Sequence, residues 1–150
     1  MNIDFTLYRQ ISVLSAFFGA LLGIVTLIPF IGTFSMIFLI CFMAPLVIWI
    51  LIKYGCLSLS SIKESVIVGA VAGFVSYLGF SVIYIPISVI LMKLFGFAAN
   101  YGIGIMLNNA GFFMLTVLSI FMGVLSATVN AFTGFLTFYV IELLNSIKKS

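Results

Sequence analysis

The sequence predicts an all-α membrane protein with four transmembrane helices. Residues 10–52 and 94–141 contain no Asp, Glu, Lys or Arg. Of the 150 residues, 65% are hydrophobic and 6% are charged, whereas charged residues make up ~25% of a typical soluble protein. A hydrocarbon core ~30 Å thick is crossed by about 20 apolar residues in a helix. The length therefore suits four spans and short connections, forming one domain.

We expect the first span at about residues 11–31 and the second at about 36–54. Pro29 lies in the last turn of the first span, and residues 32–35 are predicted to form the turn that connects the two. Pro45 lies near the middle of the second span. A proline at that point removes a backbone hydrogen bond and is expected to kink the helix.

The third span is predicted at about residues 62–85. Ser61 and Glu64 have capping-box spacing, which favours a helix that starts beside them. Pro86 leaves two interpretations open. Either the span ends there and a short helix follows along the membrane surface to Leu94, or one long bent helix continues.

The fourth span is predicted at about residues 112–141. It follows residues 97–111, which are too apolar for an ordinary loop and too rich in glycine for a regular helix. We expect that segment to be an irregular connection, resting on the membrane surface or against the bundle. A helix of this length exceeds the hydrocarbon core, so it is expected to tilt or to project from the bilayer.

The basic residues predict the orientation. With four spans, only Lys93 falls on one side of the membrane, whereas five basic residues fall on the other side: Arg9, Lys53, Lys63, Lys148 and Lys149. Cytoplasmic segments carry an excess of Lys and Arg, so both termini are expected to be cytoplasmic, in a bacterial inner membrane. The basic residues form no patch, which argues against a nucleic-acid partner.

The first and third spans resemble each other. Residues 15–25 align without gaps on residues 65–75, with identical glycines at Gly19 and Gly69 and at Gly23 and Gly73. A true duplication predicts two parallel helical hairpins related by a pseudo-two-fold axis along the membrane normal. The alternative is coincidence, because small residues at four-residue spacing are common in membrane helices.

Small residues also mark three predicted packing faces, since they let another backbone approach closely. These faces serve contacts within the bundle or contacts with a second copy or a larger partner; the sequence leaves both open. Their members are Gly19 and Gly23 in the first span, Gly69 and Gly73 in the third, and Gly123, Ala127, Ala131 and Gly134 in the fourth.

Asn130 is the most polar side chain deep in the fourth span, with Ser126 on the same face. A buried amide costs several kcal/mol unless it is hydrogen-bonded, so we expect it to face the bundle. Tyr77 and Tyr84 of the third span are candidate partners. The same four residues alternatively line a path for a solute.

Reactive groups are missing from the predicted spans. The chain has no histidine, and Asp4, Glu64 and Glu142 lie outside the spans or at their ends. Proton-coupled carriers use ionisable groups inside the membrane, and metal sites and nucleophile–base pairs need His, Cys or carboxylate clusters. We therefore expect no catalytic residues, no metal site and no cofactor.

Two short motifs carry a resemblance. Ile28-Pro29 closes the first span, and Ala44-Pro45-Leu46-Val47-Ile48-Trp49 occupies the second. With these motifs the chain resembles small bacterial four-helix membrane proteins. The resemblance implies the four-helix architecture and assigns no chemistry to any residue.

The sequence thus predicts a non-catalytic integral membrane protein whose partners are the lipid bilayer and a second copy or a larger membrane protein. An accessory, assembly or self-associating subunit fits the packing faces. The alternative is a small permease or channel for an uncharged solute or lipid, with Asn130 on its path.

Overall fold

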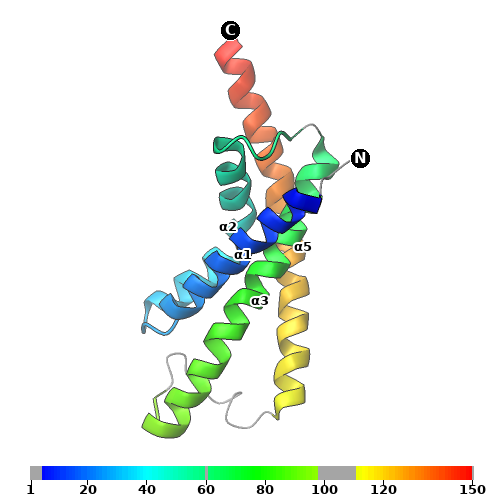
Figure 1. Cartoon of the computed structure of the whole chain (residues 1–150). Coiled ribbons are helices and arrows are strands. Elements are labelled where there is room, and N and C mark those ends of the chain that lie inside the picture. Colours follow the sequence, from blue (N-terminus) through cyan, green and yellow to red (C-terminus); the bar gives the residue numbers. More distant parts are fainter. Residues whose placement is uncertain (1–4, 60, 98–110, 150) are drawn as a thin grey trace.

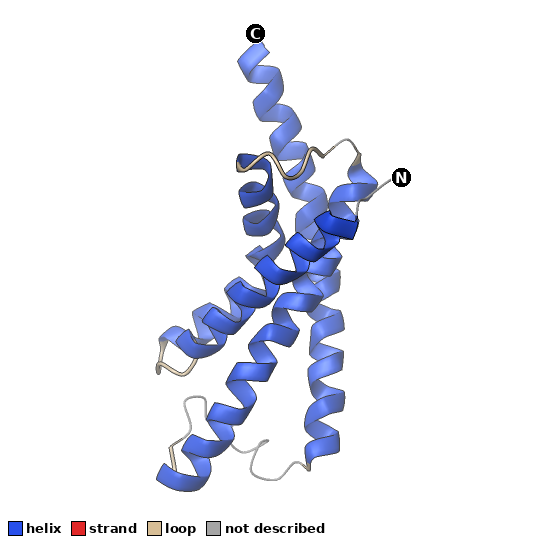
Figure 2. Cartoon of the chain, in the orientation of Figure 1, coloured by secondary structure: helices blue, strands red, loops and turns tan. Residues whose placement is uncertain are grey.

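The structure is a computed structural model that describes residues 5–59, 61–97 and 111–149, and in those ranges it contains helices and no strands. The chain runs up and down between the two ends of the bundle (Figure 1), and a short turn connects α1 to α2 (Figure 2). Each helix is long and apolar enough to cross a membrane, which confirms the predicted fold class. The helices are α1 (Phe5–Val25), α2 (Ile31–Lys53), α3 (Ile62–Phe95) and α5 (Phe112–Lys149).

Helix α3 is the centre of the bundle. It packs extensively along both α1 and α5, and α2 packs on α3 and α5. Although α1 and α2 are consecutive in sequence, they contact each other least among the packed pairs. The fully buried apolar side chains include Ile11, Leu39, Met43, Ile48 and Val68, so all of the first three helices contribute to the core.

The contact between α1 and α3 is a contact between backbones. A Cβ atom on Gly19 would overlap the Ser76 carbonyl group, and one on Gly79 would overlap the carbonyl oxygen of Ala16. Between helices in lipid, apolar burial provides no net driving force, so such close van der Waals contact is what holds them together.

The contact between α3 and α5 is equally close. A Cβ atom on Gly69 would overlap the Asn130 carbonyl oxygen, and one on Gly134 would lie 2.6 Å from the Ser65 carbonyl oxygen. The glycine pair of α1 thus faces α3, whereas its counterpart in α3 faces α5. The contacts of the two glycine pairs therefore do not follow the two-fold relation that a duplication suggests.

The first turn differs from the predicted one at residues 32–35. The chain reverses at residues 26–30, where Phe30 has a positive φ of 68°, and α2 already begins at Ile31. Pro29 lies within this reversal, and it has a fixed φ and no N–H to donate. Gly32 lies inside α2. Glycine is required there because a Cβ atom would come within 2.5 Å of a carbonyl oxygen in the turn.

α1 is displaced from its predicted span of 11–31, because it begins at Phe5 and ends at Val25. The other three helices are longer than predicted, and α5 continues to Lys149. α3 continues through Pro86 to Phe95, so the long-helix interpretation holds and the boundary at residue 85 is wrong. In lipid a broken helix would expose unpaired backbone groups, which favours a continuous helix with one missing hydrogen bond. Residues 98–110, to which most of the predicted connection belongs, lie outside the described ranges.

The start and end of α3 have identifiable caps. Ser61 precedes the helix, and its Oγ accepts a hydrogen bond from the Glu64 N–H at 3.3 Å, which confirms the predicted cap. Gly96 ends the helix in a left-handed conformation with φ of 61°, a geometry that glycine adopts without steric cost.

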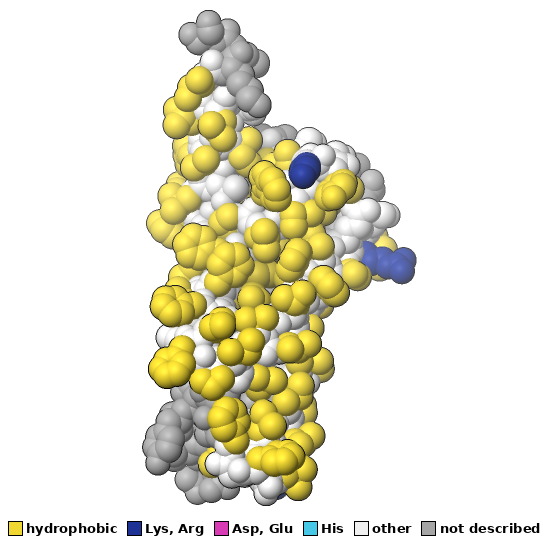
Figure 3. Space-filling model, turned by 90° about the vertical axis from the view of Figure 1, so that its left-hand side faces the viewer, with side chains coloured by type: hydrophobic (Ala, Val, Ile, Leu, Met, Phe, Trp, Pro, Cys, Tyr) yellow, Lys and Arg dark blue, Asp and Glu magenta, His cyan; other side chains and the backbone are white. Residues whose placement is uncertain are grey.

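The outer surface is apolar over most of the molecule. Figure 3 shows hydrophobic side chains from the lower end to the projecting upper end, with Lys or Arg visible only in the upper half of this face. Exposed residues include Phe17, Phe34, Val82 and Phe121. A surface of this kind is stable in contact with lipid and not with water.

We predict that Gly19→Ala destabilises the protein by about 2 kcal/mol, because the added methyl group forces two backbones apart. Titration of the reconstituted protein with a denaturing detergent measures this. Gly123→Ala is the matched control, since its nearest neighbour is the movable ring of Phe74 at 3.2 Å. Equal effects of the two substitutions would contradict a direct backbone contact between α1 and α3 at Gly19.

Candidate functional site

The most polar group inside the bundle is the fully buried side chain of Asn130 on α5. Its Oδ1 accepts a hydrogen bond from the backbone N–H of Ala44 at 2.7 Å. Its Nδ2 donates to the carbonyl oxygen of Ile40 at 2.8 Å and to those of Ser126 and Leu39 at 3.0 and 3.3 Å. The amide is therefore satisfied on both of its ends by backbone groups.

The backbone groups of Ala44 and Ile40 explain why the Asn130 amide lies against this turn of α2. In a regular α-helix the N–H of Ala44 would pair with the carbonyl of Ile40. Here the Asn130 amide pairs with both groups. The next residue is Pro45, whose ring clashes with the carbonyl of the preceding turn and bends the helix. We infer that this bend opens the turn that the amide then bridges.

Serine side chains extend the polar contact to α3. Ser126 Oγ donates to the Gly73 carbonyl oxygen at 3.0 Å, and Ser65 Oγ donates to the Gly134 carbonyl oxygen at 2.5 Å. The Gly73 carbonyl oxygen also accepts a hydrogen bond from Ser76 Oγ of its own helix at 3.0 Å. Asn130, Ser126 and Ser65 thereby connect α2, α3 and α5 in one polar cluster.

The predicted packing residues lie between helices of this one chain. Gly23 approaches Phe80 and Ile83 of α3, and Gly73 approaches the Asn130 side chain. In α5, Gly134 lies against Ser65, Ala131 lies beside Gly69, and Gly123 lies against a ring, whereas Ala127 is half-buried. The predicted faces of α1 and α3 are accordingly covered within the bundle.

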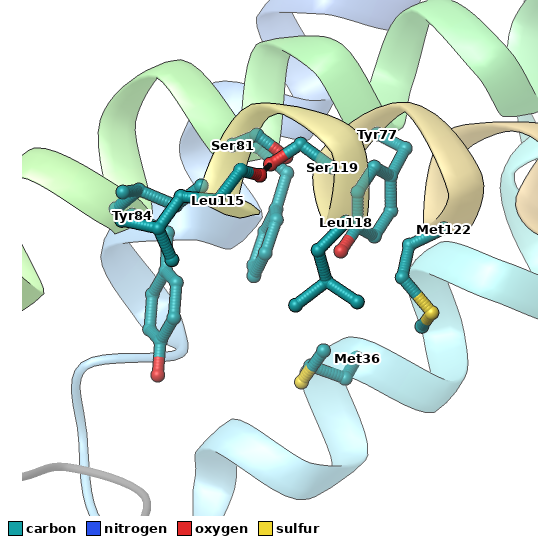
Figure 4. A pocket seen from close by; sticks show the side chains of 10 residues that line it. Met36, Tyr77, Ser81, Tyr84, Leu115, Leu118, Ser119 and Met122 are labelled. Carbon is teal, nitrogen blue, oxygen red and sulfur yellow. Dashed lines mark hydrogen bonds between the residues drawn. The ribbon is translucent and has the colours of Figure 1, made fainter. Parts of the chain in front are cut away.

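The predicted tyrosines lie at a different place from Asn130. Tyr77 and Tyr84 line a pocket of about 330 Å³ between α3, α5 and α2. Figure 4 shows both rings projecting from α3 toward the space that Leu118 of α5 and Met36 of α2 also border. Ser81, which lines the same pocket, has a buried Oγ with no hydrogen-bond partner. Asn130 is not part of this lining.

Two participants were not identified from the sequence. The backbone groups of Ile40 and Ala44 bind the amide, and no side chain marks them. The available signal was the combination of a proline in the middle of one apolar span and an asparagine in the middle of another. The contact of Ser65 with α5 was also not predicted. Ser65 lies one turn before Gly69, and this spacing places it on the helix face that contains Gly69.

No protein-family model matches the chain, and no curated protein or solved structure matches it either. The class therefore follows from the fold and its surface. The chain is an integral membrane protein with four candidate spans in its described residues, packed through glycines and one buried amide.

We predict that Asn130→Leu destabilises the protein by about 2 kcal/mol, because it leaves the Ala44 N–H and the Ile40 carbonyl without their partner in an apolar interior. Unfolding in mixed detergent micelles measures the change. Thr128→Val is the matched control, since Thr128 is exposed and bonds only the Val124 carbonyl of its own helix.

The dependence on Pro45 is tested by a double-mutant cycle. If the bend opens the turn, Pro45→Ala restores a regular helix and Asn130→Leu then costs less by about 1 kcal/mol, a coupling typical of contacting groups. Strictly additive effects of the two substitutions contradict the inferred link between proline and amide.

Proposed function

We propose that the protein is a non-catalytic membrane subunit that associates with a second copy of itself through the upper end of α5. The supporting observation is that α5 continues past the start of α3 with apolar residues exposed. The first part of this segment, at Leu136 and Val140, also borders a groove with Trp49 and Ile52 of α2. The glycine faces are covered within the chain, so association requires another surface. Asn130, Ser126 and Ser65 serve helix packing through their hydrogen bonds.

The register of α5 against α3 gives the length of this extension. Gly134 lies against Ser65, three residues after the start of α3 at Ile62. Because the two helices are antiparallel, α5 passes the start of α3 near Thr137 and continues to Lys149. At 1.5 Å per residue, this extension is about 18 Å long. It is the segment that projects at the upper end of Figure 1.

The extension has the pattern of a two-stranded coiled coil. Four exposed apolar residues, the first just before the extension, recur at spacings of four, three and four and are exposed by 45, 54, 61 and 63%: Leu136, Val140, Leu143 and Ile147. Tyr139 and Leu144, which are also exposed, flank this stripe. In a heptad frame, Val140 and Ile147 fall at position a, and the two leucines fall at position d. Branched residues at a with leucine at d favour a parallel dimer.

A parallel arrangement is also what a membrane imposes. Two copies inserted in the same orientation have parallel α5 helices, so their extensions meet in the same register. On the opposite face of the extension, Glu142 and Asn145 are exposed. A second copy of the same helix covers the apolar stripe and leaves these two polar side chains uncovered.

We predict that Leu143→Cys, with Cys41 and Cys56 replaced by alanine, forms a disulfide-linked dimer on mild oxidation in liposomes. Cα atoms at a d position of a dimer lie within disulfide range. Asn145→Cys is the matched control on the polar face and should cross-link several-fold less. Non-reducing gel electrophoresis reads the result, and equal cross-linking at the two positions rejects the proposed interface.

A second candidate, supported by the pocket that Tyr77 and Tyr84 line, is a permease for an uncharged solute or lipid. The pocket is mostly apolar and contains the hydroxyl groups of two tyrosines and two serines. Such a lining suits an uncharged amphiphile. Asn130 does not belong to this path, because its amide is fully used by the α2 backbone.

The permease predicts transbilayer movement of a fluorescent uncharged lipid in liposomes, and Leu118→Trp should slow it several-fold by filling the pocket. Leu125→Trp is the control, since Leu125 is exposed on the same helix and does not line the pocket. No movement above protein-free liposomes removes this candidate.

A further inference from the structure

A groove separates α1 and α2 in the upper half of the bundle. Its volume is about 700 Å³, and residues from Thr6 to Phe17 form one wall while residues from Ile50 to Cys56 form the other. The groove is open because each helix is held elsewhere: α1 lies on α3 through Gly19, and α2 is bound to α5 by the Asn130 amide. The two helices therefore approach each other only loosely.

The lining changes from polar to apolar along the groove. Arg9 and Gln10 lie near its upper end with Tyr54 of α2, and all three are exposed. Further along α1, Val13 and Phe17 continue the wall. Arg9 and Phe17 are eight residues apart, which is about 12 Å along a helix. The groove thus offers hydrogen-bond donors and a positive charge at one end and hydrocarbon at the other.

Within residues 5–59, 61–97 and 111–149, no carboxylate is paired with the positive charge of Arg9 at the upper end of the groove. Among the described residues, Arg9 takes part in no ion pair or side-chain hydrogen bond. Lys53, at the same end of α2, lies 5.2 Å from the centre of the Trp49 ring and likewise has no carboxylate partner within the described ranges. An anion in front of Arg9 would therefore meet no competing negative group from the described residues.

We propose that this groove binds one phospholipid with an anionic headgroup, whose phosphate faces Arg9 and whose acyl chain lies along Val13 and Phe17. A guanidinium binds a phosphate with two parallel hydrogen bonds, and Gln10 and Tyr54 provide further donors. A basic pocket between membrane helices at the positively charged side suits such a headgroup. The site is independent of the association through α5, because no residue of α5 lines it.

The test places a tryptophan in the groove and a second one outside it. In a Trp49→Phe background, Phe17→Trp reports on the groove and Phe121→Trp reports on bulk lipid around α5. Both phenylalanines are exposed, by 61 and 65%. They lie at similar depth, since Ala16 lies against Gly79 and Gly123 lies near Tyr77. The protein is reconstituted in equal mixtures of anionic and zwitterionic phospholipid, with one or the other lipid brominated to quench fluorescence.

We expect the tryptophan at position 17 to favour the brominated anionic lipid about fivefold, the preference that one basic group at a membrane surface provides, and the one at position 121 to show no such preference. Arg9→Gln should abolish the preference at position 17. Lys63→Gln removes an equally exposed charge at the same end, outside the groove, and should leave the preference intact.

Three results overturn the proposal. One is an equal lipid preference at positions 17 and 121, which requires no variant of Arg9 and so holds even if Arg9→Gln fails to fold. Another is an equal loss with Lys63→Gln and Arg9→Gln, which indicates general surface attraction. The third is displacement of the anionic lipid by inorganic phosphate, which indicates a site for a free anion.

Discussion

In a hydrocarbon interior every backbone donor and acceptor needs a partner from the protein, and Pro45 disturbs that pairing in the middle of α2. The Asn130 amide meets this constraint by offering one acceptor and one donor to the same turn. An aliphatic side chain would satisfy neither group. The hydrogen bonds described between α2 and α5 all involve this one side chain.

The other helix contacts depend mainly on close packing, because the helices contain few other polar side chains. α3 and α1 are held by glycines that allow carbonyl groups to approach, with Gly19 against Ser76 and Gly79 against Ala16. α3 and α5 combine such contacts with hydrogen bonds from Ser65 and Ser126. Since α1 and α2 are each bound to a different neighbour, their mutual contact is weak. The groove between them is a consequence of this arrangement.

The sequence predicted the structure correctly where a residue type or spacing is compatible with only one local structure. The charge-free stretches predicted the spans, and Ser61 with Glu64 predicted the start of α3, because a cap requires that spacing. The turn was misplaced because glycine is as suitable for a close contact as for a turn, and Gly32 serves the contact. Pro86 was ambiguous for a similar reason, since a proline bends a membrane helix as readily as it ends one.

The partner of Asn130 was beyond sequence reasoning for a different reason. Helices that are apolar on all sides show no stripe that identifies which face meets which neighbour. The periodicity placed Asn130 on a face with Ser126 and Gly134, and the structure brings that face to α3 and α2 together. The backbone groups that bind the amide belong to Ile40 and Ala44, residues whose side chains carry no polar signal. Tyrosines of α3 were the more visible candidates, and they lie in a pocket of their own.

The same packing also makes the two ends of the bundle unequal. The contact of Gly134 with Ser65 fixes how far α5 slides along α3, and so it carries the end of α5 past the start of α3. The groove with Arg9 opens at that same end, where Lys53 and Lys63 also lie. A span without charged residues carries no signal for its orientation in the membrane. The two ends of this protein therefore differ only through the residues that packing leaves exposed there. Shifting α5 by one turn along α3 would shorten the extension by about 5 Å and leave the groove unchanged, which separates the two proposed interactions physically.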